Sequence, residues 1–198
     1  MALNFIIIIS LYLKIHSSLV YNQIIKILIY KMSKIAFVLV AALCLSTVMA
    51  GFPHFSQGDP RWKSQKLGHG PSTIGSAGCL LTSVTSMIAG KGVKVNGASP
   101  TPPIMNKWLK AHGGFSRDNF IWGSIGKLGF KFLGKITNRN EMVKAMNAGK
   151  LVILNVNHGR HYVLATGHDK TGFKVMDPGY SKTHYKFSEV VSASLYKH

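Results

Sequence analysis

Cys79 is the side chain in this sequence with the clearest capacity for covalent chemistry. It is the only cysteine in residues 51–198, so it is a free thiol, one half of an intermolecular disulfide, or a nucleophile. We expect it in the first turn of a helix, where unsatisfied backbone N–H groups favour a thiolate and can donate to an oxyanion. A small side chain buried on that helix is the alternative, so position alone leaves both interpretations open.

A base for such a nucleophile would come from the eight histidines of residues 51–198, among which His161 has the most distinctive position. It opens a predicted apolar strand, and Asp177 closes the next one, just before Pro178-Gly179. A hairpin turning near residues 169–171 would bring the two side chains together, on one face if the loop has an odd number of residues. A carboxylate there would fix the tautomer and orientation of the imidazole. Taken singly, His161 could also be a structural histidine, and Asp177 could be the aspartate of an Asp-Pro-Gly turn.

Three helices are expected to come before most of the strands. The first follows Ser76-Ala77-Gly78, predicted as a flexible turn. The second begins at Thr101-Pro102, because Thr caps a helix and Pro suits its first position. The third begins at Asn138, which with Glu141 has the spacing of a capping box. The expected inner residues are Leu80, Val84 and Ile88 in the first helix and Ile104, Trp108 and Leu109 in the second.

The second half of the chain has the composition of β-structure. Strands are predicted at 151–156, 162–166 and 173–177, with a fourth at 183–187. Helices followed by an antiparallel meander are typical of the α+β class.

Charge and hydropathy divide the sequence into an export segment and a basic domain. Lys and Arg number 24 against six acids, a net charge of +18, which favours anionic surroundings. Met32-Ser33-Lys34, the apolar run 35–45 and Val48-Met49-Ala50 predict a cleaved signal peptide over residues 32–50, because a membrane anchor wants about 20 apolar residues. Residues 1–31 are then an N-terminal extension that a start at Met32 would leave untranslated; if translated, a membrane-tethered form becomes an alternative. Removing the four lysines of residues 1–50 leaves 20 basic residues against six acids, a net charge of +14 for residues 51–198.

Four segments of residues 53–190 resemble, in order, the papain-like C39-like cysteine peptidases. They are Phe55-Ser56-Gln57-Gly58-Asp59-Pro60-Arg61-Trp62, Thr73-Ile74-Gly75-Ser76-Ala77-Gly78-Cys79, His161-Tyr162-Val163-Leu164-Ala165-Thr166-Gly167 and Val175-Met176-Asp177-Pro178. The resemblance implies a C39-like peptidase domain over residues 51–198. Its fold would be papain-like, with an N-terminal helix bearing the cysteine packed on an antiparallel β-sheet bearing the histidine and aspartate.

The resemblance also implies a role for each site residue. Cys79 would be the nucleophile, His161 the general base and then acid, and Asp177 the residue that orients the imidazole. Gln57 would supply the oxyanion-hole side chain. It lies 22 residues before Cys79, farther than in the better-known papain-like enzymes, whereas Gln65 is nearer; an insertion between glutamine and cysteine would explain the distance.

These inferences predict a secreted thiol protease that hydrolyses peptide or amide bonds, outside the cell or in the lumen of the endolysosomal or secretory pathway. Its partner would be a peptide or protein substrate, with an anionic bacterial envelope as a further target. The alternatives are a bacterial cell-wall amidase or endopeptidase, a transglutaminase-like acyl transferase, and a non-catalytic cationic binding or antimicrobial module.

Other ligand classes have weaker support in the sequence. No nucleic-acid recognition motif accompanies the charge, so specific nucleic-acid binding is not expected. We expect no stable membrane insertion after signal cleavage. No metal or other cofactor is expected. His158, His161 and His168-Asp169 could be ligands, but His158 and His161 would point to opposite faces of a strand, and Arg160 between them would repel a cation.

Overall fold

The computed structural model describes residues 51–198. The extension and signal peptide predicted in residues 1–50 lie outside the described residues. Within the described part of the chain, no helix is long and apolar enough to cross a membrane.

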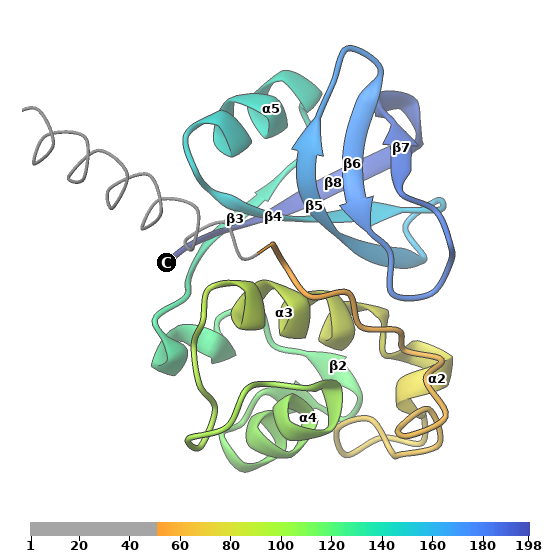
Figure 1. The fold of residues 1–198 in the computed structure, drawn as a ribbon, viewed down its shortest axis with the longest axis vertical. Coiled ribbons are helices and arrows are strands. Elements are labelled where there is room, and N and C mark those ends of the chain that lie inside the picture. Colours follow the sequence, from red (N-terminus) through yellow and green to blue (C-terminus); the bar gives the residue numbers. More distant parts are fainter. Residues whose placement is uncertain (1–50) are drawn as a thin grey trace, which may run out of the picture. The chain divides into compact units, whose positions relative to one another are not determined.

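The largest sheet of the described residues is six-stranded and antiparallel (Figure 1). His161 lies in this sheet, and Asp177 directly follows one of its strands. The order of its strands is β3-β8-β4-β5-β6-β7. The strands are β3 (Lys131–Ile136), β4 (Leu151–Val156), β5 (His161–His168), β6 (Gly172–Met176), β7 (His184–Lys186) and β8 (Val190–Lys197).

The helices of the described region are α2 (Ile74–Ala77), α3 (Cys79–Gly90), α4 (Pro102–Ala111) and α5 (Arg139–Asn147). Two 3-10 turns, η1 (Ser124–Leu128) and η2 (Phe187–Glu189), and a hairpin of β1 (Phe115–Ser116) and β2 (Asn119–Phe120) complete the fold. Of the capping box predicted for α5, the Asn138 half is present, because its side-chain oxygen accepts the N–H groups of Asn140 and Glu141 at 2.9 and 3.3 Å. In the described region the Glu141 side chain does not return a hydrogen bond to the Asn138 N–H. The Thr101 backbone is extended at the start of α4, as a cap requires, but within residues 51–198 its side chain makes no capping hydrogen bond.

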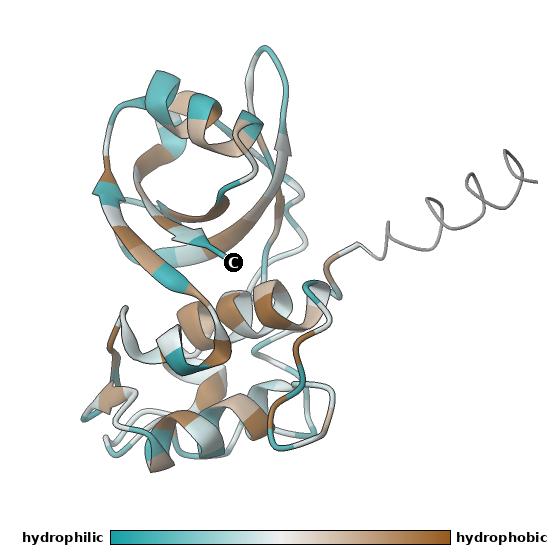
Figure 2. Cartoon of the chain, turned by 90° about the vertical axis from the view of Figure 1, so that its left-hand side faces the viewer, coloured by the Kyte–Doolittle hydropathy of each residue, from teal (hydrophilic) through white to brown (hydrophobic). Residues whose placement is uncertain are grey.

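Both faces of the sheet are buried, which explains why β4 is apolar at successive positions. Leu151 and Ile153 pack into the core that contains α3 and α4, whereas Val152 and Leu154 pack into the core that contains α5. Successive residues of a strand point to opposite faces, so a strand covered on both sides needs apolar residues throughout. Figure 2 shows the hydrophobic residues gathered on α3 and along the strands.

A β-bulge sets the face on which the site residues lie. Four residues separate the last Cα pair of β5 and β6, His168 and Phe173, and this even number alone would place the two site residues on opposite faces. The bulge between Ala165 and Gly167 adds one residue to β5 and restores the parity, so that Leu164 pairs with Met176. With this register His161 and Asp177 share a face.

The mixed helix and antiparallel-sheet architecture expected from the sequence is confirmed, with corrections of detail. The flexible turn predicted at 76–78 is wrong in part, because residues 74–77 form α2, with a reciprocal capping box between Thr73 and Ser76. Strands β3 and β8 were not predicted, although β8 lies inside the sheet between β3 and β4. The predicted inner residues Leu80 and Ile104 are only partly buried, whereas their neighbours Leu81 and Met105 are buried.

Candidate functional site

Cys79 is the first residue of α3 and is half-buried as a free thiol. The glycine before it is required by close packing, because a Cβ at Gly78 would overlap the carbonyl oxygen of Ile74 and lie 2.9 Å from its Cα. The first N–H groups of a helix have no acceptor within the helix, and they stabilise negative charge placed beside them. The sulfur therefore lies where backbone donors can serve both a thiolate and an oxyanion.

Helix α3 packs along β5, so that the start of the helix lies at the start of the strand. The Ser83 hydroxyl donates to the backbone oxygen of Tyr162 at 3.1 Å and fixes this alignment. His161 opens β5 after a turn in which Asn157 and His158 have positive φ values of 51° and 56°. The imidazole is 6% exposed and lines the same cavity as the Cys79 side chain, which is near enough to raise the pKa of the ring.

The carboxylate of Asp177 holds the imidazole from the other side. The distance between His161 Nε2 and Asp177 Oδ1 is 2.6 Å. Because Nε2 is engaged there, Nδ1 is the ring nitrogen left for Cys79. Asp177 Oδ1 also accepts the N–H groups of Gly179 and Tyr180 at 2.9 and 3.0 Å, and Oδ2 accepts the Tyr185 hydroxyl at 2.7 Å. Four donors thus fix a carboxylate that is 2% exposed.

This network shifts the pKa values of both partners toward their charged forms. Burial alone would lower the pKa of His161, but hydrogen bonds to Asp177 and Cys79, and the charges of both, raise it to about 9. Burial alone would raise the pKa of Asp177, but hydrogen bonds from His161, Tyr185 and the Gly179 N–H lower it. At neutral pH the site therefore holds an imidazolium between a carboxylate and a sulfur.

Gln57 reaches the same cavity from the N-terminal segment. Its backbone N–H donates to the Pro178 oxygen at 2.8 Å, and its side-chain Nε2 donates to the Gly75 oxygen at 2.9 Å. Its Oε1 is buried and has no hydrogen-bond partner in the described region. Gly179 keeps this corner open, since a Cβ there would lie 3.0 Å from His161 Cε1 and 3.3 Å from Gln57 Oε1. Gln65, the nearer glutamine in the sequence, is exposed and lines a different cavity against α4.

Cys79, His161 and Gln57 line a cavity of about 360 Å³. Asp177 does not line it and contacts the site through His161. Sequence reasoning missed several residues of this site. Nothing in the sequence pointed to Tyr185, because only the fold brings β7 against Asp177. Three separate segments contribute further lining residues of the cavity, which are Asp118, Arg160, Tyr162 and Tyr180. The lining residues are Gln57, Leu67, Ser76, Ala77, Cys79, Leu80, Leu81, Phe115, Asp118, Asn119, Phe120, Arg160, His161, Tyr162 and Tyr180.

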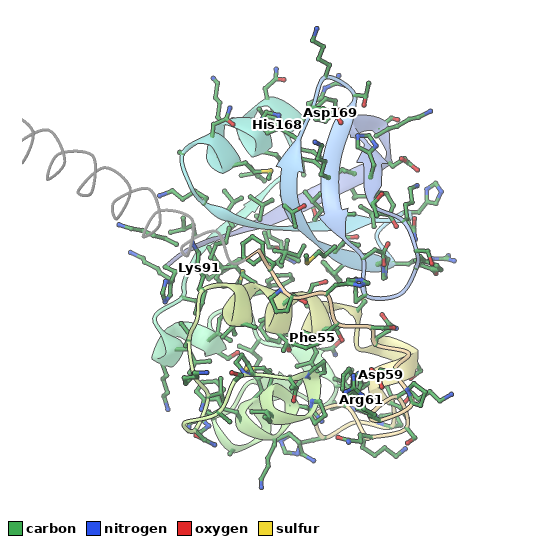
Figure 3. The ribbon with its side chains drawn as sticks, in the orientation of Figure 1. Phe55, Asp59, Arg61, Lys91, His168 and Asp169 are labelled. Atoms are coloured by element: carbon green, nitrogen blue, oxygen red, sulfur yellow. The ribbon has the colours of Figure 1, made fainter. Side chains whose placement is uncertain are left out.

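The other polar clusters considered in the sequence have ordinary partners. His168 Nε2 lies 2.8 Å from the side-chain oxygen of Asn147, and Asp169 Oδ1 accepts the N–H groups of Thr171 and Gly172. Figure 3 shows His168 and Asp169 at the end of the β5–β6 hairpin farther from α3. Among residues 51–198, no three His, Cys, Asp or Glu side chains are grouped so that they could hold a metal ion.

Comparison with solved structures gives a distant structural likeness. No family model and no curated protein sequence matches the chain. A solved structure of a candidate C39-like peptidase from Bacillus anthracis is similar, with 15% sequence identity and a TM-score of 0.39. The match covers 76% of this chain and 96% of the other.

Proposed function

We propose that the protein is a secreted cysteine peptidase of the C39-like, papain-like type, which hydrolyses peptide or amide bonds through Cys79, His161 and Asp177. One observation carries the proposal: the imidazole of His161 lies between the Asp177 carboxylate, 2.6 Å away, and the Cys79 side chain, at the wall of a cavity. A nucleophile, a base and a group that orients the base are the requirements of covalent acyl transfer.

The first half of the reaction breaks the substrate amide. The Cys79 sulfur, paired with the imidazolium, attacks the carbonyl carbon, and the carbonyl electrons move to the oxygen. The Cys79 N–H and the Gln57 amide hydrogen not bound to Gly75 would donate to that oxyanion. When the intermediate collapses, the C–N bond breaks, His161 gives its proton to the leaving amine, and a thioester remains on Cys79.

The second half returns the enzyme to its starting state. Water gives a proton to the now neutral His161 and attacks the thioester carbonyl carbon. The C–S bond then breaks, the acid product leaves, and the thiolate again faces an imidazolium. Throughout both halves Asp177 keeps the imidazole in one orientation, because Tyr185 and two backbone N–H groups hold the carboxylate.

Hydrolysis of fluorescent casein by purified variants tests the proposal. Cys79→Ala and His161→Ala should abolish cleavage. Gln57→Ala should lower the rate by about 10²–10³, the usual effect of losing one oxyanion donor. Gln65→Ala is the matched control and should keep wild-type activity, because it lines a different cavity. Casein cleavage that survives Cys79→Ala would disprove the mechanism.

Hydrolysis of bacterial cell wall is a second candidate, favoured by the net charge of +14 that 20 basic and six acidic residues give residues 51–198. Digestion of purified peptidoglycan beside casein separates the two substrates. Secretion is tested independently by N-terminal sequencing of the exported protein, which should begin at Gly51. If an envelope effect persists in Cys79→Ala, it would instead favour a non-catalytic cationic module.

A further inference from the structure

The lining of the cavity beside Cys79 contains both apolar side chains and a carboxylate. Six apolar or aromatic side chains line the cavity: Leu67, Leu80, Leu81, Phe115, Phe120 and Tyr162. Asp118 lines the same cavity from the two-residue turn of the β1–β2 hairpin. A ligand side chain bound in this cavity could therefore contact both hydrocarbon and a negative charge.

The position of the Asp118 carboxylate is fixed by its neighbours. The Ser72 hydroxyl donates to Oδ2 at 2.5 Å. A Cβ at Gly70 would lie 2.6 Å from the Asp118 Cγ, so the close approach of the carboxylate to this loop requires a glycine. The hydrogen bond from Ser72 lowers the pKa of Asp118, with a smaller contribution from the charge of Arg117, so the group is anionic at neutral pH.

Asp118 differs from most acids of this basic chain in having no cationic partner. Asp59, Asp177 and Glu189 lie 2.6 Å from Arg61, His161 and Lys182, and Asp169 lies 3.3 Å from His184. Figure 3 shows the first of these pairs, Asp59 with Arg61. In residues 51–198, no Lys, Arg or His nitrogen lies within 4.0 Å of the Asp118 carboxylate.

The cavity also contains a positive region, which lies elsewhere on its wall. Arg160 comes from the β4–β5 turn directly before His161, and it is not ion-paired with Asp118. A positively charged ligand group would therefore be repelled near His161 and attracted at the β1–β2 hairpin. This charge distribution would orient a positively charged ligand within the cavity.

We propose that Asp118 selects peptide substrates that carry a lysine or arginine side chain, whose methylene groups pack on apolar residues of the cavity lining and whose charged end binds the carboxylate. Long basic side chains commonly bury their stems on apolar surface and keep the charge at a polar partner. The inference rests on the proposed peptidase function and adds to it the class of substrate.

The test compares two fluorogenic peptides that are identical except for arginine or citrulline at one position. Citrulline has nearly the same shape as arginine but no charge. Cleavage-site mapping on a peptide library first fixes the position. Wild type should favour the arginine peptide by about 10-fold or more in kcat/KM, because a charge-assisted bond is lost with citrulline. Asp118→Asn, which keeps an oxygen for Ser72, should reduce this preference to about 2-fold or less.

Glu141→Gln is the matched control, since it removes one negative charge from an exposed position on α5 that does not line the cavity. It should keep the wild-type preference. An Asp118→Asn enzyme that still favours arginine about 10-fold would overturn the inference and leave the peptidase function standing. If Asp118→Asn does not fold, a wild-type ratio near one overturns the inference by itself. A wild type that cleaves no peptide in the library would overturn the proposed function, and the inference with it.

Discussion

Replacing Asp177 with asparagine removes the charge beside His161 while it preserves most of the geometry. The amide oxygen can still accept from His161 and from the Gly179 and Tyr180 N–H groups, and the amide nitrogen can donate to the Tyr185 oxygen. The variant therefore isolates the electrostatic contribution of the carboxylate to the pKa of His161. Asp177→Ala would not do so, because it leaves four donors without their acceptor.

The size of the effect follows from the protonation of the imidazole. With a pKa of about 9, about nine-tenths of His161 is protonated at pH 8. At the ordinary value of about 6.5, only about 3% would be protonated at the same pH. Because Cys79 still raises the pKa of His161 in Asp177→Asn, protonation alone should lower the rate at pH 8 by about 10- to 30-fold.

The assay is the pH profile of kcat/KM on a fluorogenic peptide. The upper limb of the wild-type profile should fall near pH 9, and in Asp177→Asn it should move down by about two units. NMR titration of the His161 ring checks the same pKa without reference to activity. An upper limb that stays near pH 9 in the variant would refute the reasoning that Asp177 is what raises this pKa.

Three further predictions concern the packing of the site. Tyr185→Phe removes the hydroxyl that donates to Asp177 Oδ2 and should lower the free energy of unfolding by about 1–2 kcal/mol in urea titrations; an unchanged midpoint would count against that bond. Gly179→Ala should lower kcat/KM by about 10-fold or more, because its Cβ would crowd the His161 ring at 3.0 Å, whereas Gly126→Ala, with nothing within 4 Å, should not. Finally, the pKa of His161 is higher in the folded protein than its unfolded value of 6.5, so protonation of His161 stabilises the fold fully below pH 6.5. The free energy of unfolding should fall by about 3 kcal/mol as the pH rises through about 9. A free energy of unfolding that stays constant over this range would contradict the prediction.

Local sequence signals predicted several elements of the fold. The apolar run at 151–156 coincides with β4, and Asn138 caps α5 as expected. Capping and turn chemistry depend on neighbouring residues, so one sequence is enough to detect them. Strand β8 was missed because its place in the sheet comes from pairing with β3 and β4, both far away in the chain.

Within the site, the sequence allowed prediction only of residues whose side-chain type and position in the chain indicate their chemistry. His161 and Asp177 could be paired by hairpin reasoning, but the parity that puts them on one face comes from a bulge that no residue pattern announced. Tyr185 and Asp118 could not be predicted as site residues, because tertiary packing brings each of them to the site. A one-residue change in register reverses the face of a strand, which is why such details cannot be extrapolated from periodicity.

The most direct test of the central claim is the rate at which iodoacetamide alkylates Cys79 at pH 6.5, followed by peptide mapping so that Cys44 is counted separately. His161 holds a positive charge beside the sulfur, and a thiolate, not a thiol, is the reacting species. Cys79 should react at least about 10-fold faster in the native protein than in urea, and His161→Ala should lose this advantage. Equal, slow labelling of native, unfolded and His161→Ala protein would mean that Cys79 is an inert thiol.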